Sequence, residues 1–138
     1  ELGNKRGIGL IYNNIGLVYL ETLKYNKAFS MLQKALNIQK EINAIELESI
    51  IFFSLVKKHL GKKYDTDKIL SLINKSTHIE DYVNFYLYKL IEKTSYIRTA
   101  YKQIIKKADN LESVVKAKFI CFPIPQAIIE EYNKVFKN

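Results

Sequence analysis

Few residues of this 138-residue chain have the type and spacing that catalysis or metal binding requires. The only two histidines, His59 and His78, fall on different predicted elements. A histidine-based triad or a zinc site needs further ligands in a matching pattern, and none stands out near either residue. Cys121 has no neighbouring histidine or lysine to activate its thiol, and no glycine-rich phosphate loop occurs. We therefore predict no catalytic residue, no metal site and no cofactor.

The composition predicts a globular, all-α chain. Hydrophobic residues make up 48% of the sequence and charged residues 26%, a balance that can build a core. Only five glycines and two prolines are present, which favours helices joined by short loops. The length predicts a single domain over residues 1–138.

The net charge of +8 would favour an anionic partner. The lysines are spread along the whole chain at helical spacing, however, which indicates solvated helix faces. Specific nucleic-acid binding is not favoured, because no recognition motif accompanies the charge. The single cysteine, with no signal peptide and no membrane-spanning run, predicts a cytoplasmic protein without a membrane partner. Since the chain begins at Glu1 and its only methionine is Met31, we expect a fragment of a longer protein.

Two helices are predicted at the start of the chain, over about residues 6–22 and 25–42. Gly16 lies in the middle of the first, which indicates that another helix approaches closely there. The gap between the helices is so short that they must form an antiparallel hairpin. Apolar residues recur at three- and four-residue steps and give the first helix one broad apolar face: Ile8, Ile11, Tyr12, Ile15, Val18 and Tyr19.

This hairpin resembles a tetratricopeptide repeat (TPR). The family pattern is an aromatic residue, Leu-Gly and Tyr, followed by Ala and a large apolar residue. The resemblance implies a right-handed α-solenoid of antiparallel hairpins, with a regular repeat over residues 9–42. The proline that often ends such a repeat is replaced by Lys40. The matching positions need no insertion: Tyr12, Ile15, Gly16, Tyr19, Ala28, Leu32 and Ala35.

The rest of the chain departs from the pattern. We predict a degenerate repeat over about residues 44–74, whose first helix ends at Gly61, and divergent helices over 78–120. Two prolines then predict an extended break, followed by a capping helix over 125–136. The last third is similar to the C-terminal tails of large bacterial TPR signalling proteins, which implies a regulatory or scaffolding tail. The segments that carry this similarity are Asn84–Leu90, Ser95-Tyr96, Ala100-Tyr101, Lys107–Glu112 and Phe122–Pro125.

The resemblance also implies a binding surface, because the first helix of each TPR lines the concave face of the array. Asn14 is the sharpest candidate, since its amide can donate to and accept from an extended peptide backbone. The alternative, that Asn14 only bonds a neighbouring helix, remains open. Ser54 at the matching place in the next repeat argues against a full peptide clamp. The implied positions are Leu10, Asn13, Asn14, Leu17 and Glu21, with Ser54, Lys57 and Lys58 from the next repeat.

These observations favour an interaction module over an enzyme. We expect it to bind a peptide or a partner domain on the concave helical surface, with no small-molecule substrate evident. One alternative is a structural or self-association tail, forming a homo-oligomer and regulating an upstream catalytic domain. The other is a basic surface that binds nucleic acid.

Overall fold

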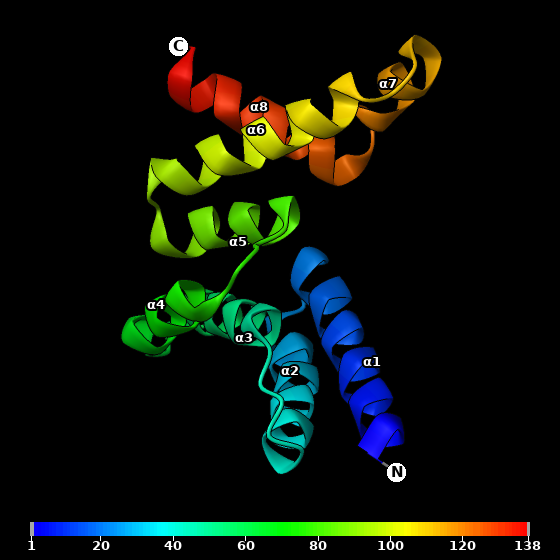
Figure 1. Ribbon diagram of the computed structural model, residues 1–138. Helices are drawn as coiled ribbons and strands as arrows, with labels where there is room; N and C mark the ends of the chain where they lie inside the picture. The colour runs from blue at the N-terminus through cyan, green and yellow to red at the C-terminus, as the bar shows by residue number, and fades with distance from the viewer. Residues whose placement is uncertain (1, 138) are drawn as a thin grey trace. The chain divides into compact units, whose positions relative to one another are not determined.

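The computed structural model describes residues 2–137, with side chains from Gly3 onward. Over this range the chain forms eight helices and no strand, so the predicted all-α class is confirmed (Figure 1). The chain divides into two compact units, residues 1–76 and 77–138.

The first unit contains α1 (Leu2–Glu21), α2 (Tyr25–Glu41), α3 (Leu47–His59) and α4 (Thr66–Lys75). α1 and α2 lie side by side as a hairpin, α3 contacts both of them, and α4 packs on α3 (Figure 1). The predicted hairpin is present, and α1 starts about one turn earlier than predicted. The α3 core is a run of seven consecutive buried residues, Ile50 to Val56 with the polar Ser54 among them, because neighbours cover several sides of this helix.

The side of α1 that faces α2 and α3 carries small and polar residues. Gly9, Asn13, Gly16 and Leu20 are buried there. A Cβ built on Gly16 would lie 2.5 Å from Cγ of Leu32, so the two helices meet where only glycine fits. This confirms that Gly16 marks a close helix approach. The apolar face predicted from the sequence lies largely elsewhere, and Ile8, Ile11, Ile15 and Val18 are exposed.

Three helices of the first unit end in the same backbone motif. A residue with positive φ follows each helix: Leu23 (62°), Asn43 (53°) and Gly61 (69°). The next N–H then donates back to the last turn, as Lys24 does to the Tyr19 carbonyl at 2.8 Å. This is the Schellman arrangement, which satisfies carbonyls that the helix end leaves open. The prediction that Gly61 ends the third helix is confirmed.

Among these three residues, Leu23 has the least favourable backbone conformation, because a leucine side chain is disfavoured at positive φ. It is also 70% exposed, so it contributes little to packing. We expect Leu23→Gly to raise the free energy of unfolding by about 1 kcal/mol, measured by urea denaturation. Asn43→Gly is the matched comparison and should change stability less, since asparagine tolerates this conformation. Equal effects at the two sites would contradict the assignment of strain to Leu23.

The second unit contains α5 (Asp81–Ile91), α6 (Thr94–Asp109), α7 (Ser113–Phe119) and α8 (Pro123–Phe136). α6 packs against both α5 and α8 (Figure 1). The core joins these three helices through five buried residues: Phe85, Ile97, Ala100, Ile104 and Ile128. α7 is a short helix without a buried residue.

The start of α8 differs from its prediction. We predicted an extended break over both prolines and a helix from Pro125. Only Phe122 is extended, with ψ 149°, and the helix begins at Pro123. Both prolines fit the first turn, where their missing N–H groups have no helical partner to lose.

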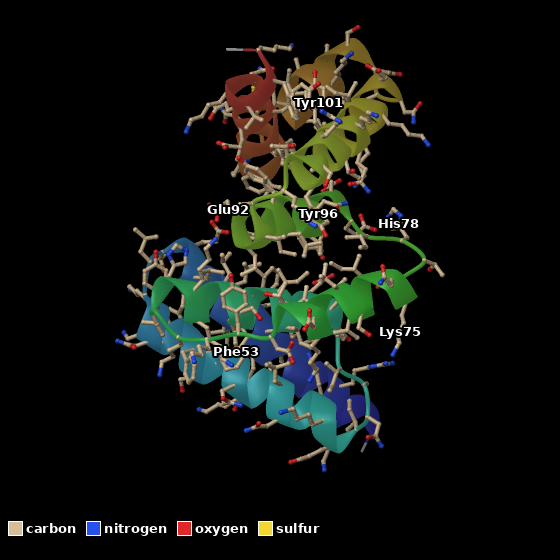
Figure 2. All side chains as sticks on the ribbon, turned by 90° about the vertical axis from the view of Figure 1, so that its left-hand side faces the viewer. Phe53, Lys75, His78, Glu92, Tyr96 and Tyr101 are labelled. Carbon is tan, nitrogen blue, oxygen red and sulfur yellow. The ribbon has the colours of Figure 1, made fainter. Side chains whose placement is uncertain are left out.

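Polar contacts and stacked rings hold the second unit together. Lys107 donates to the buried carboxylate of Asp81, and this hydrogen bond is the main cause that raises the pKa of Lys107. The Tyr88 hydroxyl donates to Glu131 at 2.9 Å and so links α5 to α8. The rings of Tyr101, labelled in Figure 2, and Tyr132 stack with centroids 3.7 Å apart, which links α6 to α8. These tyrosines therefore act in packing.

Candidate functional site

Asn13 was predicted to contact a ligand, but the fold occupies its side chain. The residue is 2% exposed, and its Oδ1 accepts a hydrogen bond from the Ser49 hydroxyl at 2.9 Å. Ser49 in turn accepts from Gln39 Nε2 at 2.7 Å, and Gln39 Oε1 accepts from the Glu46 N–H at 3.1 Å. This buried network joins α1, α2 and the start of α3. Because buried polar groups require hydrogen-bond partners, each of these side chains depends on the others to supply one. Asn13 is therefore unavailable to a ligand in this structure.

The other predicted α1 positions lie on the outside of the helix. Leu10, Asn14 and Glu21 are exposed, and Leu17 is half-buried. None of these α1 residues lines the pocket that residues of α2, α3 and α4 form. Asn14, the sharpest candidate, is solvent-accessible, and its role as a peptide contact stays a prediction.

Ser54 and Lys57 do line a pocket, together with residues of α2 and α4. The cavity encloses about 200 Å³. This is less than the roughly 300–1,000 Å³ of pockets that hold drug-sized ligands, and it suits a single large side chain. Lys58, the next predicted position, is half-buried and is not part of the lining. The residues of the pocket are Leu36, Lys40, Ile45, Ile50, Phe53, Ser54, Lys57, Asp65 and Lys68.

The pocket has an apolar floor. Leu36, Ile50 and Phe53 are buried, and each keeps part of its surface toward the cavity. Phe53, labelled in Figure 2, also packs against the ring of Phe29 with centroids 4.9 Å apart, so α2 holds its ring in place. A preformed apolar floor of this kind binds an apolar group at low cost in ordering.

The rim of the pocket is cationic. Lys40, Lys57 and Lys68 come from three different helices, and Lys57 Nζ lies 4.6 Å from the Phe53 ring centroid. Among the described residues of the lining, Asp65 is the one carboxylate. Its Oδ1 accepts the backbone N–H of Lys68 at 3.0 Å and caps α4. The rim therefore favours a ligand that carries negative charge beside its apolar group.

Seven of the nine lining residues were not among the predicted site positions, and three of the seven carry the argument: Lys40, Phe53 and Lys68. Lys40 stood out only because it replaces the repeat's usual proline. Phe53 looked like one more residue of an apolar run. Lys68 joins the site because α4 packs on α3, a tertiary contact that helical periodicity does not encode. A search of the sequence for lysines close to an apolar aromatic residue would have selected Lys57. The repeat resemblance had already named Lys57 as a candidate site residue.

The described residues contain no group of three or more His, Cys, Asp or Glu side chains that could hold a metal ion. His59 stacks on Tyr25, with ring centroids 4.5 Å apart, and His78 lies 3.2 Å from Glu80 in the segment before α5 (Figure 2). Cys121 is exposed at the end of the turn before α8. Each of the two histidines therefore has a neighbouring side chain as its partner.

Among the described residues, no helix is both long enough and apolar enough to cross a membrane. No protein-family model, no curated protein and no solved structure matches this chain. The pocket and its charges are the observations that a proposal of function can use.

Proposed function

We propose that this chain is a TPR-like protein-interaction module whose α2–α3–α4 pocket binds a peptide segment of a partner protein. The observation that carries the proposal is the small apolar cavity with three lysines at its rim. An apolar side chain of the peptide fills the cavity, and acidic residues on either side of it meet Lys40, Lys57 and Lys68. Affinity comes mainly from the buried apolar group, and the lysines add specificity and speed association.

The repeat resemblance supports this proposal through packing. Gly16 and Ala28 are buried where α1 and α2 meet, as the TPR pattern implies. In a helical-repeat array each hairpin stacks on its neighbours and leaves one continuous face for a ligand. The cytoplasmic location remains an expectation from the sequence composition, and the signalling context and a bacterial source remain expectations from the repeat resemblance.

The test is selection of peptides from a random displayed library against the purified chain, followed by titration with fluorescence anisotropy. We expect the selected peptides to combine a large apolar residue with acidic neighbours. Lys57→Glu or Lys68→Glu should raise Kd at least about tenfold, since each reverses a charge at the rim. Lys134→Glu is the matched control, because the same charge change in α8 lies outside the pocket.

Two results would contradict the proposal. One is a selected set without acidic residues, and the other is an equal loss of affinity in the Lys134→Glu control. A single-stranded oligonucleotide tested in parallel addresses the nucleic-acid alternative. Binding whose affinity falls steeply with salt, and falls equally in all three variants, would favour a dispersed basic surface instead.

A further inference from the structure

Ser54 places a hydroxyl in the apolar floor of the α2–α3–α4 pocket. Ile50, Phe53, Ser54 and Lys57 all line the pocket, and they occupy the i, i+3, i+4 and i+7 positions of one face of α3. Ser54 is 5% exposed, and of the lining residues that the structure describes it has the one uncharged polar side chain. The side chains of the floor are therefore apolar apart from this hydroxyl.

The Ser54 hydroxyl makes no hydrogen bond within the part of the chain that the structure describes. Thr99 in α6, in contrast, donates to the Ser95 carbonyl one turn earlier at 2.9 Å. The Ser54 oxygen is not sealed inside the protein either, since over the described range the one fully enclosed side-chain atom without a partner belongs to Asn133. Because Ser54 is otherwise buried and lines the cavity, its hydroxyl opens into the pocket. It can donate one hydrogen bond there and accept others.

The cavity limits which side chain can use this hydroxyl. A carboxylate or an amide would carry several polar atoms onto Leu36, Ile50 and Phe53, where one hydroxyl cannot satisfy them all. Phenylalanine or leucine would cover the Ser54 hydroxyl and leave it buried without a partner, which lowers affinity. Tryptophan can donate to Ser54 but cannot accept from it, so the hydroxyl proton would stay unpaired. A phenol meets every condition, because it combines an apolar ring with one hydroxyl that both donates and accepts.

We propose that the pocket anchors its peptide through a tyrosine whose phenol hydroxyl bonds to Ser54. The inference rests on the proposed peptide-binding function and names the anchor residue. A cavity of about 200 Å³ takes one large side chain, and the tyrosine ring packs there against the Phe53 ring, which Phe29 holds in place. The acidic neighbours of the tyrosine then meet the lysines of the rim.

The first test uses p-cresol, which reproduces the tyrosine side chain, and toluene, which reproduces that of phenylalanine. Each compound is titrated into the isotope-labelled chain, and amide chemical shifts report both the Kd and the site. Toluene is the more hydrophobic of the two, so each compound is compared between the wild type and Ser54→Ala. We expect Ser54→Ala to raise the Kd of p-cresol on the order of tenfold, because one hydrogen bond is lost. The Kd of toluene should stay within about twofold, since toluene makes no such bond.

Ser71→Ala is the control for this test. Ser71 is exposed in α4 and does not line the pocket, so its loss should change neither Kd. Ser54→Ala should also leave the midpoint of urea denaturation unchanged, because the Ser54 hydroxyl has no partner in the fold. A p-cresol Kd that Ser54→Ala does not raise would overturn the proposal. So would equal losses for p-cresol and toluene, or p-cresol shifts that lie outside the pocket.

The second test uses the peptides selected from the displayed library. We expect tyrosine as the shared large residue, and phosphorylation of that tyrosine should raise Kd at least about tenfold, because it carries charge to the apolar floor. Tighter binding of the phosphorylated peptide would place the end of the ring at the lysine rim and overturn the proposal.

The two tests separate this inference from the proposed function. Selected peptides that share leucine or phenylalanine would overturn the tyrosine anchor and leave peptide binding standing. A chain that selects no peptide would contradict the proposed function, while the p-cresol titration still decides whether Ser54 binds a phenol.

Discussion

Replacing Ser49 with alanine is expected to lower the free energy of unfolding by about 3 kcal/mol. The Ser49 hydroxyl donates to Asn13 and accepts from Gln39, so one substitution removes both hydrogen bonds. Asn13 and Gln39 are themselves buried, and each would keep a polar atom without a partner or water. An unsatisfied buried group costs about 1–3 kcal/mol, which is why this effect exceeds that of an ordinary lost hydrogen bond.

Urea denaturation followed by circular dichroism measures this effect, with an unchanged m-value as the check that the unfolded state is the same. Ser71→Ala in α4 is the matched control, since Ser71 is exposed, and it should stay within about 0.5 kcal/mol of wild type. A loss in Ser49→Ala as small as that of the control would show that the network contributes nothing to stability.

A double-mutant cycle tests whether the network acts as a unit. Asn13→Leu alone should destabilise the fold, because it leaves the Ser49 hydroxyl without its acceptor. Combined with Ser49→Ala, it should cost less than the sum of the two single changes, by about 0.5–3 kcal/mol. Strict additivity would mean that the two side chains do not interact.

The same network shows where the sequence interpretation reached its limit. Periodicity correctly predicted helices in both units and placed their ends within about a turn, because local propensity and capping decide them. It put the apolar side of α1 inward, since apolar residues usually face the core. The inner side instead carries Asn13 and two glycines, because hydrogen bonds to α3 and close contact with α2 replace apolar burial there.

The pocket shows a similar limit. The resemblance placed Ser54 and Lys57 on a binding surface, and both line the cavity. The remaining lysines come from α2 and α4, and their meeting depends on how those helices pack around α3. Single residues of a site can therefore be predicted from a repeat pattern, while the set of residues that closes around a ligand depends on tertiary packing.

Gly16→Leu is expected to destabilise the first unit by about 3 kcal/mol or more, through overpacking. Even a Cβ at this position would lie 2.5 Å from Cγ and 2.7 Å from Cδ2 of Leu32, whose side chain is fully buried. α1 must then move off α2, which also strains the hydrogen bond between Asn13 and Ser49 one turn away. Thermal and urea unfolding should both report the loss.

Gly7→Leu in the same helix separates this steric effect from helix propensity. Nothing lies within 4 Å of a Cβ at Gly7, so leucine there should be neutral or stabilise α1 by up to about 1 kcal/mol. If Gly16→Leu were as stable as Gly7→Leu, the close approach of α1 and α2 could not be what requires glycine at position 16. If Gly16→Leu lowers the free energy of unfolding and Gly7→Leu raises it, then the two glycines of α1 have different roles. Gly16 is required by the close packing of the hairpin, whereas Gly7 is only tolerated on the exposed face of the helix.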